Sequence, residues 1–479
     1  MRRFSSAVSL GAMLALAACS ENSPAPAPNE PAVIAPNFAQ ASGVQPTGKY
    51  IVSFKSGGAS TLPGQVAALG GTIDWISAGA GIATVSGLNA TQAGSLKGKT
   101  NVTTVDADVA VAIDYPALET SVEAAPADAV ESPANPAGAF FFARQWHMRA
   151  VQADLAWAAG KLGSSSVSVF ILDTGIDYTH LDLQGRVDMT HSVDMLGTFN
   201  VNGVPFTEAD TVQKYFPGRA AFTDLFFHGT HVAATVSSNA LAAAGVTSQT
   251  TLVAVKVCAY LNTCPLSSTL AGVIYAADHG ADVMNLSLGG TFGKAGNGNL
   301  LSLINSTFNY AKNKGVTIVV SAGNSAIDLD HDKSGYKTYC STPATICVAA
   351  TGPTSQGSTN GPWTNIDAPA YYTNFGTSAI NVAAPGGNNA SFVWEACSRT
   401  SLIVPVCQTG TFIIGVQGTS MASPHVAGTA ALLVPILGRD PGAIKSRLQG
   451  SADDLGPVGA DPFYGKGRVN TARAAGVIP

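Results

Sequence analysis

The sequence predicts an α/β protein whose main domain is a mostly parallel, twisted sheet with helices on both faces. Short apolar runs such as residues 167–172 are nearly continuous, which is typical of strands covered on both sides. These runs alternate with segments of helical period, and repeated strand–helix–strand units join parallel strands. Apolar residues make up 46% of the 479 residues and charged residues only 11%, so the chain can bury a large core.

Residues 1–18 have the pattern of an export signal. Arg2 and Arg3 precede an apolar run over residues 7–18 that is too short to span a membrane. The run leads into a Leu-Ala-Ala-Cys sequence that resembles a bacterial lipobox, and the resemblance implies lipidation of Cys19. An ordinary secretory signal cut near Ala18 is the alternative. Both signals predict export, to an outer membrane as a lipoprotein or to the extracellular space.

Six further cysteines lie in three close pairs, each flanking a short loop. Sequence alone does not determine the pairing. An exported protein meets an oxidising compartment, so local disulfides are the favoured interpretation, with buried free thiols as the alternative. Zinc is disfavoured by the spacing. The pairs are Cys258 and Cys264, Cys340 and Cys347, and Cys397 and Cys407.

The chain before the main domain divides into three parts. Residues 19–47 are rich in Pro, Ala, Asn and Ser and predict a disordered tether. Residues 48–113 alternate as βαββαβ and predict a small α+β domain. Residues 114–139 are again rich in Pro and Ala and predict an exposed, cleavable linker. Within the small domain, strands are expected at 50–54, 71–76, 81–85 and 102–113, and helices at 65–70 and 90–96.

The main domain is expected to span residues 140–479. Its strands are expected at 167–172, 251–257, 282–288 and 316–321, with a further strand ending at 382–383. Its helices are expected at 150–157, from about 228, at 268–279, at 300–314 and after Ser420.

Ser420 is the strongest candidate nucleophile. It lies among small residues in Gly-Thr-Ser-Met-Ala-Ser-Pro-His, directly before a helical pattern. A helix N-terminus presents unpaired backbone N–H groups and positive dipole character to a substrate carbonyl. Pro424 is expected in the first helical turn, where its missing N–H costs nothing.

Two upstream motifs complete a catalytic set. Asp173 ends an apolar strand, where a carboxylate needs a partner, and His228 opens a His-Gly-Thr-His sequence. The order Asp, His, Ser is that of subtilisin. The three motifs resemble those of the subtilisin-like serine proteases, the subtilases or peptidase S8 family, over about residues 140–479. This resemblance implies a subtilisin-like fold and a serine endopeptidase that hydrolyses protein or peptide substrates through an acyl-enzyme, with Asp173, His228 and Ser420 as its triad.

The resemblance also implies residues around the triad. Asn324 matches the oxyanion-hole asparagine. His231 and His425 match structural histidines, while a metal pair of His228 and His231 is the disfavoured alternative. Asp177 is the competing acid, interpreted as a turn or substrate-side residue. The residues expected to bind the extended substrate are Ser287, Leu288, Gly289, Gly290, Ala322 and Gly323.

The small domain resembles the inhibitory propeptide of subtilases, of the inhibitor I9 type, with an unrelated domain as the alternative. The resemblance implies a self-processing zymogen that is inhibited by its own propeptide. Because Cys19 precedes this domain, processing between about 114 and 145 would separate the enzyme from its lipid anchor.

No cofactor is required for this chemistry. Asp182 matches a calcium-binding position of some relatives, but the loop after Val236 looks shorter here, so calcium is left open. The net charge of −5, without a long basic run, gives no indication of nucleic acid. The sequence disfavours two other functions. A catalytically silent peptide-binding protein on the same fold is disfavoured by the complete residue set, and an esterase by the absence of G-x-S-x-G around Ser420.

Overall fold

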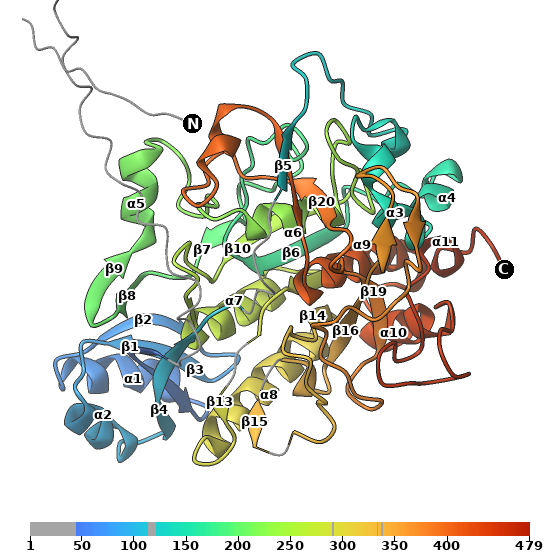
Figure 1. The fold of residues 1–479 in the computed structure, drawn as a ribbon. Helices are drawn as coiled ribbons and strands as arrows, with labels where there is room; N and C mark the ends of the chain where they lie inside the picture. The colour runs from blue at the N-terminus through green and yellow to red at the C-terminus, as the bar shows by residue number, and fades with distance from the viewer. Residues whose placement is uncertain (1–44, 114–120, 290–291, 333, 337–338) are drawn as a thin grey trace, which may run out of the picture. The chain divides into compact units, whose positions relative to one another are not determined.

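The computed structural model describes residues 45–113, 121–289, 292–332, 334–336 and 339–479. Within these residues the largest sheet has seven strands in the order β19-β16-β14-β12-β6-β10-β7, and every pairing in it is parallel. The predicted fold class is confirmed (Figure 1). The strands are β6 (Ser168–Asp173), β7 (Val193–Asp194), β10 (Thr251–Lys256), β12 (Val283–Leu286), β14 (Thr317–Ser321), β16 (Thr345–Thr351) and β19 (Val382–Pro385).

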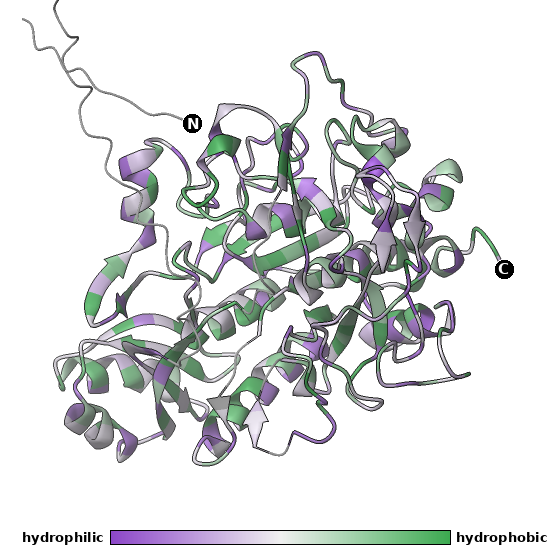
Figure 2. Cartoon of the chain, viewed as in Figure 1, coloured by the Kyte–Doolittle hydropathy of each residue, from purple (hydrophilic) through white to green (hydrophobic). Residues whose placement is uncertain are grey.

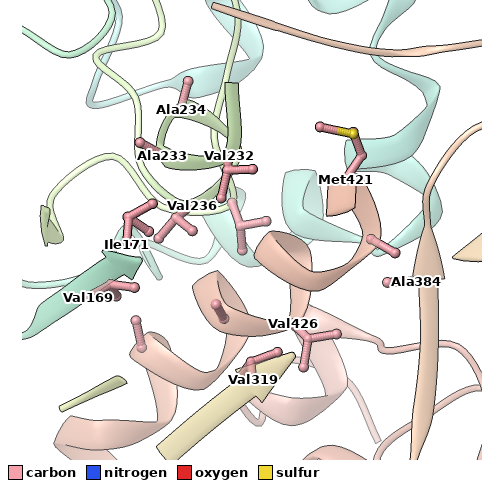
Figure 3. Packing of buried hydrophobic residues seen from close by; sticks show 14 of the residues in the cluster. Val169, Ile171, Val232, Ala233, Ala234, Val236, Val319, Ala384, Met421 and Val426 are labelled. Atoms are coloured by element: carbon pink, nitrogen blue, oxygen red, sulfur yellow. The ribbon is translucent and has the colours of Figure 1, made fainter. Parts of the chain in front are cut away.

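Alternate residues of each central strand enter two different apolar clusters. In β6, Val169 and Ile171 pack with α6 (His228–Val236) and α9 (Thr419–Leu437), as Figure 3 shows. Their neighbours Phe170 and Leu172 pack on the other face with α7 (Leu266–Asp278) and α8 (Gly298–Asn313). Both faces of the sheet are therefore dry. This burial explains the continuous apolar runs in the sequence and the hydrophobic colouring of β6 and β10 in Figure 2.

Further helices and strands complete the main domain. The helix expected at 150–157 is two helices, because Gln152 takes a left-handed φ of 55° between them. The helices are α3 (Trp146–Ala150), α4 (Ala153–Ala158), α10 (Pro441–Gly450) and α11 (Thr471–Ala474), with 3-10 turns at Pro136–Gly138, Phe142–Arg144, Tyr339–Ser341 and Pro405–Thr409. The strands are β11 (Cys264–Pro265), β13 (Phe292–Gly293), β15 (Gly335–Tyr336), β17 (Ser355–Gln356), β18 (Trp363–Thr364), β20 (Val393–Ala396) and β21 (Phe412–Val416).

The N-terminal unit has the expected βαββαβ order. Its first helix begins earlier than the predicted 65–70, because Leu62 and Val66, four residues apart, are both buried in the unit's own core. Its elements are β1 (Gln45–Phe54), α1 (Gly58–Ala67), β2 (Thr72–Ser77), β3 (Ile82–Ser86), α2 (Ala90–Lys97) and β4 (Val102–Val111). The edge strand β4 pairs with β11 of the main domain, so one sheet continues across both.

The segment after the N-terminal unit is attached to the main domain. Strand β5 (Ser121–Ala124) pairs with β21, and the Arg144 guanidinium binds the Glu123 carboxylate at 2.6 Å and 2.8 Å. Most side chains of residues 121–135 remain at least partly exposed. The described part of the predicted linker is therefore accessible, but its backbone is held.

An additional subdomain, which the sequence pattern did not reveal, lies between β7 and α6. It consists of the hairpin β8 (Thr198–Val201) and β9 (Val204–Thr207), followed by α5 (Glu208–Tyr215). Glu208 and Lys256 are both fully buried and form an ion pair at 2.5 Å that joins α5 to the end of β10.

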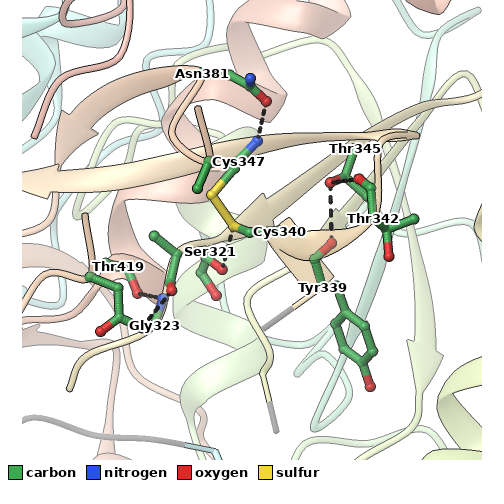
Figure 4. Close-up of a disulfide and its surroundings, with 12 residues drawn as sticks. Ser321, Gly323, Tyr339, Cys340, Thr342, Thr345, Cys347, Asn381 and Thr419 are labelled. Atoms are coloured by element: carbon green, nitrogen blue, oxygen red, sulfur yellow. Dashed lines mark hydrogen bonds between the residues drawn. A yellow bond between two sulfur atoms is a disulfide. The ribbon is translucent and has the colours of Figure 1, made fainter. Parts of the chain in front are cut away.

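Disulfides join the three predicted cysteine pairs within the described residues. The Cys340–Cys347 bond lies beneath the end of β14, where Cys340 Sγ is 3.5 Å from the Ser321 carbonyl oxygen (Figure 4). Of the helices in the described ranges, α9 alone is long and apolar enough to cross a membrane, and 83% of its apolar window is buried in the protein.

Candidate active site

Asp173 and His228 meet at the carboxyl end of the sheet. Asp173 ends β6 and His228 begins α6, and both side chains are fully buried. His228 Nδ1 lies 2.7 Å from Asp173 Oδ1, and because an ionised carboxylate only accepts, Nδ1–H is the donor. A Cβ at Gly229 would lie 2.1 Å from the Gly175 carbonyl oxygen, so glycine is required for α6 to approach this closely.

Ser420 is the second residue of α9, and its place differs from the prediction in one respect. The helix starts at Thr419, so Pro424 lies in the second turn instead of the first. An α-helix would bond the N–H of residue 424 to the carbonyl of residue 420, and proline lacks that N–H. Ser287 Oγ donates to the Ser420 carbonyl instead, at 2.7 Å, and Ser420 Oγ donates to the Ser287 carbonyl at 3.1 Å. Pro424 thus leaves the carbonyl of the candidate nucleophile available to Ser287, which follows β12 (Val283–Leu286).

Asn324 lies beyond the end of β14, against the start of α9. Its Oδ1 accepts hydrogen bonds from the Thr419 backbone N–H and from Thr419 Oγ1, both at 2.8 Å. Thr419 Oγ1 in turn accepts the Gly323 N–H at 3.0 Å. These contacts hold the amide oxygen of Asn324 against Thr419, the residue that precedes Ser420.

The predicted substrate-binding residues lie around Ser420 where the structure describes them. Ser287 contacts Ser420 directly, and Leu288 follows it in the same segment, while Gly290 lies outside the described residues. Ala322 and Gly323 follow β14. Gly323 has a φ of 93°, and a Cβ there would lie 2.5 Å from Asn374 Nδ2, so a side chain is excluded at this position.

A buried polar network supports the start of α6. Asp224 accepts bonds from the Thr230 N–H (2.9 Å), Thr230 Oγ1 (2.6 Å) and Thr174 Oγ1 (2.9 Å). Burial raises the pKa of Asp224 to about 6 and that of Glu208 to about 7, while Lys256 opposes both shifts. The lysine also donates to the Thr223 carbonyl at 2.6 Å. Sequence reasoning missed this set; the one available signal was a lysine at the end of an otherwise apolar strand.

The alternative candidates have other partners. Asp177 accepts from the Thr179 N–H at 3.0 Å and from the Arg399 N–H at 2.7 Å, as a turn residue does. His231 Nε2 is 3.2 Å from the Val393 carbonyl oxygen. His425 contacts a further buried histidine, His147, at 2.9 Å.

The residues around Asp182 do not fit a calcium ion. The Asp182 carboxylate accepts the backbone N–H groups of Leu241, Ala242 and Ala243 at 2.7, 2.9 and 3.1 Å. A calcium ion takes oxygen ligands, whereas N–H groups that face the carboxylate already provide its positive partners. The described residues contain no group of three or more His, Cys, Asp or Glu side chains able to hold a metal ion.

Comparison with known proteins identifies the family. The Subtilase family profile matches residues 164–467. Thermitase from Thermoactinomyces vulgaris is 31% identical over 343 residues, which cover 71% of this chain and 99% of that protein. A thermophilic serine proteinase from Bacillus sp. (strain AK1) is 32% identical and covered to 69%, and subtilisin DY from Bacillus licheniformis is 30% identical and covered to 96%.

Solved structures show the same fold. An epidermin leader peptide processing serine protease from Staphylococcus aureus has a TM-score of 0.68 at 19% identity, over 90% of this chain and 98% of that one. Fervidolysin from Fervidobacterium pennivorans has a TM-score of 0.66 at 22% identity, over 91% of this chain and 61% of that one. The protein is thus an enzyme of the serine peptidase class. The chain belongs to the subtilase family.

Proposed function

We propose that the protein is an exported serine endopeptidase, made as a self-processing zymogen, with Asp173, His228 and Ser420 as its catalytic triad. The observation that carries this proposal is the buried bond of 2.7 Å between His228 and Asp173, at the same end of the sheet as Ser420. The carboxylate orients the imidazole and stabilises its charged form, which leaves Nε2 to act as the base.

The reaction begins when the Ser420 hydroxyl turns from the Ser287 carbonyl to His228. Nε2 takes the hydroxyl proton while Oγ attacks the carbonyl carbon of the scissile peptide bond. The imidazolium then returns this proton to the leaving amine, and the C–N bond breaks to give the acyl-enzyme. Water, deprotonated by His228, attacks the ester carbonyl and releases the acid, and the proton returns to Ser420.

Asn324 and the Ser420 backbone N–H are proposed to bind the oxyanion of each tetrahedral intermediate. The contacts of Thr419 fix the Asn324 amide before substrate arrives, so no reorganisation is needed as charge develops. Ser287, Leu288 and the glycines after them would pair with the extended peptide by strand addition.

The N-terminal unit is proposed to act as the propeptide. Asp108, only 1% exposed, accepts the Ser267 N–H at 2.8 Å and Ser267 Oγ at 2.6 Å at the start of α7. Burial raises the pKa of this carboxyl, against the hydrogen bonds from Ser267 and Thr47. The likeness to the solved Staphylococcus aureus protease covers 90% of this chain, which is a larger share than the main domain makes up. The likeness therefore extends into the N-terminal unit.

Export is proposed from the signal pattern and from the three disulfides, which persist in oxidising compartments. Cys19, the proposed lipidation site, lies outside the described residues. Cleavage after the N-terminal unit would separate the enzyme from a lipid at Cys19. Recovery of active enzyme with an uncut, lipid-bearing N-terminus would contradict this order of events.

The test compares purified wild type with Ser420→Ala by intact mass and N-terminal sequencing. We expect wild type to lose its first ~110–145 residues and to cleave casein, and the variant to stay whole, because removal of a triad member costs several orders of magnitude in rate. Two whole proteins without caseinolytic activity would favour a silent peptide binder. Identical cleavage of both would show that another protease performs the maturation.

A further inference from the structure

Asn262 lies in a tightly closed loop between β10 and α7. The Cys258–Cys264 disulfide joins the two ends of this loop. Inside it, the Ala259 N–H donates to the Thr263 carbonyl at 2.8 Å and the Asn262 N–H donates to the Ala259 carbonyl at 3.0 Å. Asn262 itself has a left-handed φ of 55°, a conformation that asparagine adopts more readily than most residues. The direction of its side chain is therefore set by a rigid frame.

The Asn262 side chain binds a backbone, not a side chain. Its Oδ1 accepts the Ile113 N–H at 2.8 Å, and its Nδ2 donates to the Ile113 carbonyl oxygen at 3.2 Å. The amide group thus pairs with both polar groups of one residue, as a neighbouring strand would. This pair of hydrogen bonds does not depend on the side chain of the residue that is bound. Only proline could not form both bonds, because it has no backbone N–H.

The loop contacts the backbone of one candidate catalytic residue, Asp173. Its first residues, Val257 and Cys258, donate their N–H groups to the Asp173 carbonyl at 2.9 Å and 3.1 Å. Ile113, only 3% exposed, belongs to the same apolar cluster as Leu288, which follows Ser287 beside Ser420. The loop that carries Asn262 thus contacts the backbone of Asp173, and the residue that Asn262 binds packs in the same cluster as the segment beside Ser420.

We propose that Asn262 is a substrate-positioning residue that clamps the backbone of one peptide residue on the N-terminal side of the cleaved bond. Ile113 occupies this place in the uncut chain, and a substrate residue takes it once the N-terminal unit has left. The clamp selects an extended polypeptide with a free N–H at that position. This inference rests on the proposed function.

The test uses processed wild type, Asn262→Gly and Asn262→Asp. Glycine keeps the left-handed backbone without strain and removes both bonds, whereas aspartate keeps the shape and loses the Nδ2 donor. Asn202→Gly is the matched control, because Asn202 is also a left-handed asparagine (φ 52°) and is exposed in the β8–β9 turn. Each enzyme is assayed on a long internally quenched peptide and on a short acyl p-nitrophenyl ester that cannot reach the loop.

Loss of two neutral hydrogen bonds predicts a fall of about ten- to thirtyfold in kcat/KM on the long peptide, mainly through KM. The ester should be hydrolysed by Asn262→Gly within about twofold of wild type, since the clamp does not touch the reacting atoms. Proline is also placed in turn at each position of the long peptide before the cleaved bond. At one of these positions, proline should lower kcat/KM of wild type by about ten- to thirtyfold and leave kcat/KM of Asn262→Gly almost unchanged.

Equal kinetics of Asn262→Gly and wild type on the long peptide would overturn the clamp. Parallel losses on peptide and ester would also overturn it, since they would indicate a structural role. A wild type that hydrolyses neither substrate would refute the proposed function first, and with it the clamp. Hydrolysis of the ester by wild type therefore separates failure of the inference from failure of the function.

Discussion

Replacing His425 by asparagine should lower the free energy of unfolding at pH 8. The same replacement should make that free energy fall less when the pH is lowered from 8 to 5. In the wild type the Trp394 N–H donates to His147 Nε2 at 3.3 Å. His147 Nδ1 then lies 2.9 Å from His425 Nε2, and His425 Nδ1 lies 2.8 Å from the Met421 carbonyl oxygen. Each ring has one donor and one acceptor nitrogen in this series, so both rings are neutral. The chain of bonds links β20 to the helix that carries Ser420.

The size of the effect follows from burial. Desolvation lowers the pKa of His425 to about 4, below the usual value of about 6.5. The unfolded chain therefore binds this proton first as the pH falls, so stability that is fully present above pH ~6.5 is lost down to pH ~4. Between pH 8 and pH 5 the loss from this one group is about 2 kcal/mol. Desolvation also lowers the pKa of His231, to about 3, and adds a similar loss.

The comparison of two proteins is needed because other groups also change the stability with pH, and a carboxyl group whose pKa is raised by burial acts in the opposite direction. Burial raises the pKa of Glu208 to about 7, so this group favours the folded state more at acid pH. A difference between wild type and His425→Asn cancels such contributions. At pH 8 the variant should be about 1–3 kcal/mol less stable, because asparagine can keep the bond to Met421 but leaves His147 Nδ1 without its acceptor. At pH 5 the gap should shrink by about 2 kcal/mol.

Guanidinium unfolding of the full chain, followed by tryptophan fluorescence in a Ser420→Ala background to prevent autolysis, measures this gap. His279→Asn is the matched control, because His279 Nδ1 also contacts the carbonyl four residues earlier, at 2.8 Å, but on an exposed side chain. The gap between this control and wild type is measured at the same two pH values, as the reference for replacing a histidine that makes such a bond at the surface. A His425→Asn gap that is as large at pH 5 as at pH 8 would refute the argument that this histidine is held neutral by burial.

Two further predictions concern the site and its surroundings. Asn324→Leu should lower kcat on peptides by about 10²–10³ with KM changed little, a magnitude known from a subtilisin, and an unchanged kcat would remove Asn324 from the oxyanion hole. Asp182→Asn should lower the free energy of unfolding by at least about 2 kcal/mol, because the variant loses acceptors for three backbone N–H groups, and excess EDTA should change the calorimetric midpoint of this variant and of wild type equally. A calcium-reversible fall of the midpoint in EDTA that occurs in wild type and not in Asp182→Asn would contradict this interpretation of Asp182.

The central sheet could be predicted because each of its strands has a recognisable pattern within a few consecutive residues. Strands covered on both faces need apolar residues at nearly every position, so β6 and β10 stand out in the sequence. The subdomain of β8, β9 and α5 could not be predicted in this way. Its buried carboxylate, Glu208, looks like a surface residue until the fold supplies Lys256 as its partner, and those two residues are 48 positions apart (256 − 208).

The candidate triad was predictable for a different reason. Its three residues lie in short motifs, and a parallel sheet brings the carboxyl ends of its strands to one edge, so Asp173 and His228 meet although 55 positions separate them. The contacts that depend on loop conformation were not predictable. The amide donors to Asp182 and the amide pair of Asn262 with Ile113 require particular φ and ψ angles, which residue types alone do not specify.

Three residues break a local rule near this site, and each break has a specific partner. Pro424 interrupts a helix, and Ser287 Oγ takes the bond that it leaves open at Ser420. Lys256 ends an apolar strand, and Glu208 neutralises it. Asn262 adopts a left-handed backbone, and Ile113 accepts and donates at its amide. A violation that is compensated by one precise contact is costly to maintain for stability alone, because an ordinary residue would satisfy the same backbone. All three contacts lie beside the candidate site, since Lys256 pairs with Asp173 in the sheet, the Asn262 loop follows it, and Ser287 binds Ser420. They therefore support function at this end of the sheet without appeal to the triad itself.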